Sequence, residues 1–259
     1  MNKIPQTAAM IVIGNEVLSS KVIEKNGVLA IAQLRQWGVL LKRVVYVPDE
    51  KEVIVDEIRR CQQYADCVIT SGGIGPTHDD VTLESVAMAC QVPLVTSAVL
   101  LDRLIAHAQK DDSLLCLDRA QLELFSRLPE GARLIDVGHP FLSVIEINHI
   151  YALPGVPRHF ESLFLGLAPY FKQSPFYVGT LEVNLLEPVF AHSLALVQIR
   201  YPDVFIGSYP RTEGHSDALV KITCESKTQN QVNACFQALL SLFDAHAIVR
   251  AVAPAAMNE

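Results

Sequence analysis

The chain has 259 residues and carries 21 basic and 28 acidic side chains, so its formal net charge is −7. Half of the residues are hydrophobic and 19% are charged, which excludes intrinsic disorder because a disordered chain needs low hydrophobicity and dense charge. The acidic balance argues against nucleic acid as the main partner, since neutralising phosphates requires a basic surface. The length allows one large domain or two smaller ones.

No run of 18 uncharged apolar residues occurs, so the sequence predicts neither a membrane-spanning helix nor a membrane partner. The first apolar run, at 8–13, is too short for a signal peptide and breaks at Gly14, which favours a buried strand in a cytoplasmic protein. The six cysteines form no Cys-x-x-Cys pair, and we expect reduced thiols in mostly buried positions. They are Cys61, Cys67, Cys90, Cys116, Cys224 and Cys235.

The first 95 residues alternate between strand and helix patterns. The expected strands are 8–13, 39–47, 67–70 and 92–95, and the expected helices are 24–37, 50–65 and 82–90. Asp49 and Glu52 have the spacing of a capping box at the start of the second helix. This order is typical of βαβ units, and it predicts a parallel sheet with helices on both faces.

The following segment, 97–126, has the pattern of two helices separated by a polar stretch at 109–113. Next, 132–137 and 141–147 flank Gly138-His139-Pro140 and predict a hairpin. A short strand at 151–153 leads through Pro154-Gly155-Val156-Pro157 into a helix at 158–167, with the second proline suited to its first turn.

The composition turns polar at 172–175, where we place a boundary between domains 1–172 and 173–259. The second domain has the order β-α-β-β-α, which predicts a small α+β domain with its helices on one face of the sheet. Its expected elements are strands 177–185, 204–208 and 218–224 and helices 190–200 and 229–243. We expect the tail after Val252 to be frayed.

Ligands of open parallel sheets bind beyond the carboxyl ends of the strands, and two loops occupy that edge, at 14–20 and 71–82. The second loop holds three glycines in four residues, Gly72, Gly73 and Gly75, so its backbone N–H groups can approach an anion. The helix that follows adds partial positive charge, which favours phosphate. We expect Thr82, or an aspartate before it, to cap this helix.

Asp79 and Asp80 place two carboxylates beside this anion site, an arrangement that makes sense if a divalent cation or a ribose hydroxyl lies between. Glu16 follows the first strand and is placed to join them around a metal ion. The alternative is that all three are helix caps or solvated loop carboxylates. His78 is a candidate metal ligand, phosphate donor or acid, or an exposed loop histidine.

Other chemistries lack their motifs. No Gly-x-Ser-x-Gly elbow and no Gly-x-x-x-x-Gly-Lys-Ser/Thr loop occurs, so neither an acyl-transfer triad nor a P-loop nucleotide hydrolase is indicated. The remaining histidines share no metal-ligand spacing, and we interpret them as structural. They are His139, His149, His159, His192 and His215.

Three segments together resemble a known family: 14–19, 72–82 and 153–157. Their strings Gly-Asn-Glu-Val-Leu-Ser, Gly-Gly-Ile-Gly-Pro-Thr-His-Asp-Asp-Val-Thr and Leu-Pro-Gly-Val-Pro are similar to the MoaB/Mog molybdopterin-binding domains, and most of all to the N-terminal part of the CinA branch. The resemblance extends over about residues 8–225. It implies a three-layer αβα Mog-like domain with a mainly parallel sheet, followed by a small KH-like α+β domain.

The resemblance also implies chemistry. The Mog branch binds molybdopterin, whereas CinA-like proteins and the related domain of eukaryotic FAD synthases are associated with metal-dependent hydrolysis of dinucleotide pyrophosphates such as ADP-ribose, FAD or NAD. It implies a divalent metal (Mg²⁺, Mn²⁺ or Co²⁺), with a monovalent cation as a further candidate, and a homo-oligomer, either dimer or trimer. CinA proteins carry a further deamidase domain, which this sequence does not extend to.

Departures from the Mog pattern favour the pyrophosphate chemistry. Ile74 stands where Thr is usual, and Asp79 stands where Arg is usual, so the loop loses a cation and gains a carboxylate. Ser20 stands where many relatives have Gly, and it restricts the first loop if that position needs a positive φ. Asn15 stands where many relatives have Asp. The RNA-binding Gly-x-x-Gly loop of KH modules is absent.

We therefore predict an enzyme that hydrolyses the pyrophosphate of ADP-ribose or a related dinucleotide. The expected catalytic and metal-binding residues are Glu16, Asp79 and Asp80. The expected phosphate and nucleotide contacts are Gly14, Ser19, Asn26, Gly72, Gly73, Gly75, Thr77, His78 and Thr82. Two alternatives stay open: a non-catalytic protein that binds molybdopterin as its ligand, and a degenerate module that serves assembly.

Overall fold

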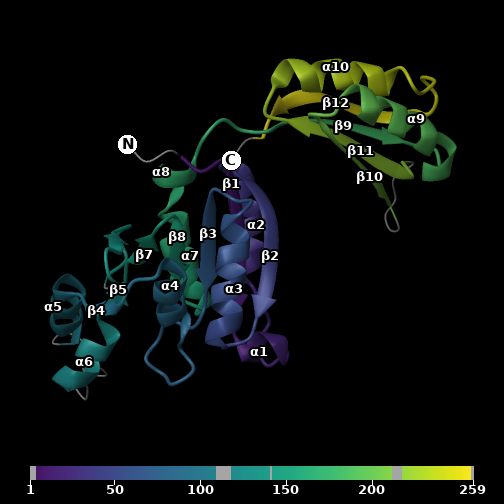
Figure 1. Cartoon of the computed structure of the whole chain (residues 1–259). Helices are drawn as coiled ribbons and strands as arrows, with labels where there is room; N and C mark the ends of the chain where they lie inside the picture. Colours follow the sequence, from purple (N-terminus) through teal and green to yellow (C-terminus); the bar gives the residue numbers. More distant parts are fainter. Residues whose placement is uncertain (1–3, 109–117, 141, 212–217, 258–259) are drawn as a thin grey trace. The chain divides into compact units, whose positions relative to one another are not determined.

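The computed structural model describes residues 4–108, 118–140, 142–211 and 218–257. The chain forms two compact units, unit 1 (Met1–Lys172) and unit 2 (Gln173–Glu259), each with its own sheet (Figure 1). No helix in the described part of the chain is long and apolar enough to cross a membrane.

Unit 1 is built on a six-stranded sheet with the order β2-β1-β3-β8-β7-β6. The strands are β1 (Thr7–Ile13), β2 (Leu40–Val47), β3 (Cys67–Ser71), β6 (Arg133–Ile135), β7 (Val144–Ile147) and β8 (Ile150–Leu153). β1, β2, β3 and β8 are parallel, and β7 runs antiparallel to both of its neighbours. The predicted mainly parallel sheet is therefore confirmed.

Helices cover both faces of this sheet. They are α2 (Asn26–Gln36) and α7 (Pro157–Leu165) on one face and α3 (Lys51–Gln62) and α4 (Thr82–Cys90) on the other. Even-numbered residues of β1, from Ala8 to Val12, pack in the core of α2 and α7, and odd-numbered residues, from Ala9 to Ile13, pack in the core of α3 and α4. This double burial explains the uninterrupted apolar run of β1, and it confirms the three-layer αβα architecture.

A smaller substructure of unit 1 contains β4 (Leu94–Thr96), β5 (Arg127–Pro129), α5 (Ala98–Ala108) and α6 (Arg119–Phe125) (Figure 1). The prediction that 92–95 continues the parallel run was wrong, because β4 pairs antiparallel with β5 in a separate two-stranded sheet. The predicted pair of helices is present as α5 and α6. The polar stretch predicted at 109–113 lies outside the described residues.

The predicted hairpin around Gly138 is present, since β6 pairs antiparallel with β7; its residue Phe141 lies outside the described part. A second hairpin, which the sequence analysis missed, joins β7 to β8. Its turn consists of Asn148 and His149, with φ angles of 49° and 61°. Asn tolerates this left-handed conformation, so the turn was detectable in principle from Asn148 between two apolar runs.

Unit 2 is an antiparallel sheet with the order β10-β11-β9-β12, and both of its helices cover one face (Figure 1). Its elements are β9 (Tyr177–Val183), α9 (Glu187–Arg200), β10 (Phe205–Pro210), β11 (Val220–Ser226), α10 (Gln229–Leu240) and β12 (Ile248–Ala256). The predicted α+β architecture is confirmed. The predicted frayed tail was wrong, because 248–256 is an edge strand that pairs antiparallel with β9.

The described cysteines are free thiols, as predicted. Cys90 is half-buried and four others are buried, while Cys116 lies outside the described residues. The buried four are Cys61, Cys67, Cys224 and Cys235.

Candidate active site at the carboxyl edge of the sheet

The parallel strands β1, β2, β3 and β8 end at one edge of the unit 1 sheet. The loops that follow β1 and β3 therefore meet there, as the sequence predicts, and the loop that follows β8 lies at the same edge. Each of these loops carries one of the three family-like motifs, and their contacts define the candidate site.

The first loop contains a short helix, α1 (Asn15–Leu18), directly after β1. The Glu16 carboxylate folds over Gly14, where an added Cβ would lie 2.5 Å from Glu16 Oε1. A larger residue at position 14 would displace the Glu16 carboxylate from this place. The Ser19 hydroxyl donates to the carbonyl of Asn15 at 2.7 Å, so it holds the end of α1.

Asp49 belongs to this site rather than to a helix cap. Its carboxylate accepts a hydrogen bond from the backbone N–H of Asn15 at 2.8 Å, whereas α3 begins after Glu50 without a side-chain cap. The capping role predicted for Asp49 was therefore wrong. The residue instead links the end of β2 to the start of α1.

Ser20 has a φ angle of 56°, in the left-handed region. This confirms the condition under which the sequence analysis expected Ser20 to restrict the loop. A non-glycine residue in this conformation costs on the order of 1–2 kcal/mol.

The start of the second loop is held against β1, β8 and α4. Gly72 has a φ angle of 106°, and an added Cβ would lie 2.1 Å from the carbonyl oxygen of Ile13. Its N–H donates to the Leu153 carbonyl at 3.1 Å. This N–H, a predicted phosphate donor, is therefore already bonded to the end of β8. Gly73 has a φ angle of 63° and lies directly over the Thr82 hydroxyl.

Thr82 is fully buried, and its hydroxyl donates to the Gly72 carbonyl at 2.8 Å. Its backbone N–H donates to the Gly73 carbonyl at 2.9 Å. Thr82 is the first residue of α4, the capping position is held by Val81, and no side chain caps the helix. The predicted cap by Thr82 or an aspartate was therefore wrong, and Thr82 instead shapes the glycine turn.

The rest of this loop is organised around the carboxylate of Asp80. Its two oxygens accept the backbone N–H groups of Gly75 and Thr77, each at 2.8 Å. The Thr77 hydroxyl lies 2.5 Å from Asp79 Oδ1 and 2.5 Å from Asp80 Oδ2, so one proton serves two carboxylates. The backbone N–H groups of this loop thus bind the carboxylate of Asp80, which belongs to the same loop.

Asp79 and His78 are the outer groups of the loop. The Thr77 hydroxyl, the largest influence, holds the pKa of Asp79 below its ordinary value, with a smaller contribution from His78. His78 is 98% exposed, and its Nδ1 lies 3.9 Å from Asp79 Oδ1. Asp79 is therefore an ionised, accessible carboxylate at neutral pH.

Asn26 links the loop after β8 to the end of β3. It is buried, and its amide donates to Ser71 Oγ and to the Gly155 carbonyl, both at 2.8 Å. An added Cβ at Gly155 would lie 3.2 Å from the Cα of Gly72, so the two loops touch through glycine. Ser71 and the tight packing of Gly155 were missed because no sequence spacing connects them to Asn26.

Six of the twelve predicted residues form two groups. Glu16 and Asn26 line a small pocket of about 30 Å³ together with Ser71 and Gly155. Gly75, Thr77, Asp79 and Asp80 form the second group through their hydrogen bonds. Within the described part of the chain, no three His, Cys, Asp or Glu side chains lie close enough to hold a metal ion together.

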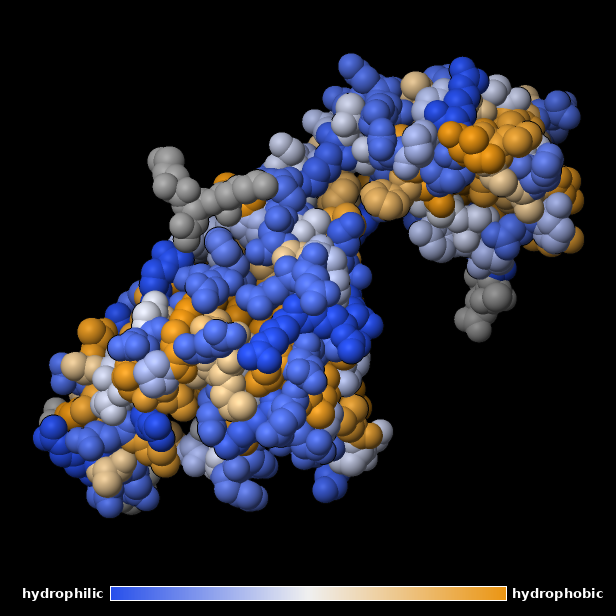
Figure 2. All heavy atoms as spheres, in the orientation of Figure 1, coloured by the Kyte–Doolittle hydropathy of each residue, from blue (hydrophilic) through white to orange (hydrophobic). Residues whose placement is uncertain are grey.

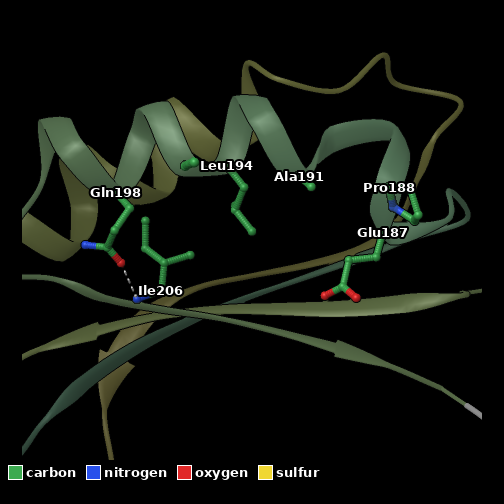
Figure 3. A pocket seen from close by; sticks show the side chains of 7 residues that line it. Glu187, Pro188, Ala191, Leu194, Gln198 and Ile206 are labelled. Carbon is green, nitrogen blue, oxygen red and sulfur yellow. Dashed lines mark hydrogen bonds between the residues drawn. The ribbon is translucent and has the colours of Figure 1, made fainter.

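A wider groove of about 560 Å³ lies in unit 2 between α9 and β10 (Figure 3). Its lining is mostly apolar, with Leu194 and Ile206 facing the space and Glu187 at one end. The amide of Gln198 is bonded to backbone groups of Val204 and Ile206, which joins α9 to β10. The groove lacks the convergent polar groups of a catalytic site, and the candidate chemistry therefore lies in unit 1.

Apolar side chains are also gathered on the surface of unit 2 (Figure 2). α9 buries Phe190 and Val197 and leaves other apolar residues exposed. They include Val189, Leu196 and Ile199, and Leu186, directly before α9, is exposed as well.

Two family descriptions match successive parts of the chain. "Probable molybdopterin binding domain" matches residues 9–173, and "FAD synthase, middle domain" matches residues 175–252. The two matches meet at the boundary between unit 1 and unit 2.

Similar proteins extend over both units. A protein of Aeropyrum pernix is 31% identical over 91% of this chain and 90% of its own length. A "Probable FAD synthase" of Caenorhabditis briggsae is 29% identical over 94% of this chain but only 50% of its own length, so this chain spans half of that relative. A "CinA-like protein" of Myxococcus xanthus is 34% identical over 59% of this chain.

Among solved structures, the protein CinA of Thermoplasma acidophilum has a TM-score of 0.56 and 25% identity, and the match covers 63% of this chain and 96% of that one. This similarity agrees with the three-layer fold of unit 1. The chain therefore belongs to the MoaB/Mog family of molybdopterin-binding domains, in the branch of the CinA N-terminal domain, with a second unit of the FAD synthase middle-domain type.

Proposed function

We propose that unit 1 is a hydrolase that cleaves the pyrophosphate bond of a dinucleotide such as ADP-ribose, FAD or NAD. The observation that carries the proposal is the second loop, at the ligand edge of the sheet. There the backbone N–H groups of Gly75 and Thr77 donate to Asp80, and the Thr77 hydroxyl joins Asp80 to Asp79. The full-length relatives described as probable FAD synthases support a nucleotide as substrate.

A divalent metal ion fits these donors if the substrate phosphates supply some of its ligands, because the carboxylates do not form a complete metal site by themselves. Mg²⁺ in nucleotide enzymes is held by one or two carboxylates plus substrate phosphates, with water in the remaining positions. Asp79 is accessible, Glu16 lines the small pocket, and Asp80 Oδ1 keeps a second lone pair beyond the hydrogen bond that it accepts from the Gly75 N–H. When bound, such an ion polarises a phosphoryl oxygen and lowers the pKa of water.

The chain's own residues position the substrate. Asp80 fixes the backbone at Gly75 and Thr77, so the loop keeps one shape when phosphates approach. Asp79 remains ionised, because the Thr77 hydroxyl lowers its pKa, and it is available to accept a proton or to hold a cation. Thr82 and Asn26 act indirectly, by holding the glycine turn and the three loops in contact.

The test measures AMP release from ADP-ribose by the full chain and by Asp79→Asn, Asp80→Asn and Glu16→Gln variants. We expect a loss of turnover of about 100-fold or more in the aspartate variants, the size typical of groups that stabilise transition-state charge. Asp56→Asn on exposed α3 surface is the matched control and should keep wild-type turnover. Wild-type rates in both Asp79→Asn and Asp80→Asn would contradict the assignment.

The same preparation tests the second reading of the family match, a non-catalytic molybdopterin-binding protein. That reading predicts a pterin fluorescence signal in the protein as purified and no release of AMP with any divalent metal.

A further inference from the structure

Helix α9 of unit 2 is apolar on the side that faces solvent as well as on the side that faces the sheet. Phe190 and Val197 pack in the core of unit 2, whereas Val189 is 68% exposed and Ile199 is 75% exposed. A surface helix of a globular protein normally has a polar outer side, and a helix that is apolar all round is normally buried. The composition of α9 therefore indicates a second contact surface.

The exposed residues of α9 form one continuous surface, the outer face of α9. It consists of Pro188, Val189, His192, Ala195, Leu196 and Ile199. These positions recur every three or four residues, so they lie on one side of the helix. None of them is charged, because the charged residues of α9 are its first and last ones, Glu187 and Arg200.

The second helix of the same unit has an ordinary solvated face. α10 buries Val232 and Phe236 against the sheet and exposes Asn230, Asn233 and Gln237. Both helices cover the same face of one sheet (Figure 1), so the apolar outer face is a property of α9 and not of unit 2 as a whole.

The charges of α9 favour a second copy of the chain as the occupant. The net charge of the chain is −7, so two copies repel each other unless they meet through a surface without excess negative charge. When two copies of α9 pack antiparallel, Glu187 of one copy lies at the same end as Arg200 of the other. The helix dipoles then also oppose each other favourably, whereas parallel packing brings like charges and like helix ends together.

The sizes of the side chains are also self-complementary. If residue 187 of one helix lies opposite residue 200 of the other, Ile199 faces Pro188 of the copy and Leu196 faces Ala191. Large residues thus meet small ones, as interdigitating helices require. Pro188 and Ala191 also line the groove of about 560 Å³ between α9 and β10, which leaves space for the side chains of the copy (Figure 3).

We propose that the outer face of α9 is the surface through which two copies of this chain associate, as an antiparallel pair of α9 helices about a two-fold axis. Each copy contributes the same surface, so the contact closes on itself and produces a dimer rather than a filament. The proposal does not depend on the reaction in unit 1, and it assigns a surface to the homo-oligomer that the family resemblance implies.

The first test measures the mass of the full chain by light scattering over a concentration series. We expect a dimer for the wild type, and a dimer Kd about tenfold higher or more for Leu196→Glu, because the pair would bury the new carboxylate. Leu196 is 55% exposed in the single chain, so the substitution leaves the core of unit 2 intact. Gln237→Glu, at an exposed position of α10, introduces the same charge and should leave the dimer Kd unchanged.

A second test depends on the direction of the two helices. In the antiparallel pair the two copies of position 195 are offset by about 4.5 Å along the helix, and those of position 189 by about 14 Å. Only the first offset lies within the reach of a disulfide. Oxidation with diamide should therefore produce a cross-linked dimer of Ala195→Cys and not of Val189→Cys, with the wild type as the background for the native cysteines.

A wild type that stays monomeric over the whole series would overturn the proposal, and its retention on phosphatidylcholine vesicles would then assign the outer face to a lipid surface. A dimer with the same Kd in Leu196→Glu would place the contact elsewhere and overturn it as well. Equal cross-linking of the two cysteine variants would contradict the antiparallel pair.

Discussion

The carboxylate of Asp80 occupies the backbone N–H groups that the glycine-rich loop offers to an anion. Gly75 and Thr77 donate to it at 2.8 Å, and Gly72 donates to β8. A phosphate approaching this loop therefore meets a negative group that is already bound. This favours a substrate that arrives with a cation, because the cation screens the repulsion between phosphate and carboxylate.

The backbone strain at Ser20 can be tested by a single substitution. Ser20→Gly removes the left-handed strain at φ 56°, and we expect the free energy of unfolding to rise by about 0.5–1 kcal/mol in urea titrations. Ser19→Gly is the matched control. Ser19 has a φ angle of −91°, so glycine relieves nothing there and should lower stability.

Equal effects of these two substitutions would show that the backbone at position 20 is not strained.

Individual residue roles were only partly predictable from the sequence. The glycines at 72 and 73 and the strain at Ser20 follow from local chemistry, since a positive φ and a missing Cβ are properties of one position. The bond from Asn26 to Ser71 and Gly155 joins residues 45 and 129 positions apart. Such a contact depends on how the strands are ordered in the sheet, which the local pattern does not contain.

Between elements, Asn26 connects α2, β3 and the loop after β8. Asn26→Ala leaves the Gly155 carbonyl and the Ser71 hydroxyl without this donor, and we expect a loss of about 1–3 kcal/mol in the free energy of unfolding. We also expect weaker ADP-ribose binding, because the touching loops at Gly72 and Gly155 lose their link. Denaturant titration and calorimetry measure the two effects.

Ser71→Ala separates these contributions, since it removes one of the two Asn26 contacts. The double variant should lose less than the sum of the single losses, as expected for residues in direct contact. Strict additivity would contradict the proposed role of Asn26 as a link between elements.

Strands were predicted well where burial was strong, whereas at the edges the pairing of β4 was wrong and β12 was taken for a frayed tail. β1 and β3 are buried on both faces, so their apolar runs identify them. β4 and β12 are largely exposed edge elements with weak patterns, and their pairing partners are set by neighbouring strands. Asp49 was misplaced for a similar reason. Asp49 and Glu52 have the spacing of a capping box, but the Asp49 carboxylate instead accepts a hydrogen bond from the backbone N–H of Asn15 in α1, a contact that the local sequence does not predict.

At the scale of the whole molecule, the two units have separate hydrophobic cores. Phe236 belongs to the core of unit 2, and Phe164 belongs to a core of unit 1. Phe236→Ala should destabilise unit 2 by about 3–5 kcal/mol and leave ADP-ribose binding to folded unit 1 unchanged. Phe164→Ala should abolish that binding at the temperature where unit 1 unfolds.

Calorimetric scans of both variants, with and without ADP-ribose, provide the measurement. A ligand that shifts the transition lowered by Phe236→Ala would contradict the placement of the site in unit 1, because a ligand stabilises only the unit that binds it. The predicted homo-oligomer, dimer or trimer, is checked in the same samples by light scattering.

The proposed hydrolysis of a dinucleotide pyrophosphate by unit 1 can be tested without any variant. The most direct measurement is AMP formation from ADP-ribose by the wild-type full chain, with Mg²⁺, Mn²⁺ or Co²⁺ and with a chelator. We expect AMP and ribose 5-phosphate in equal amounts, in the presence of a divalent metal and not with the chelator. No AMP from ADP-ribose, FAD or NAD with any of these metals would contradict it.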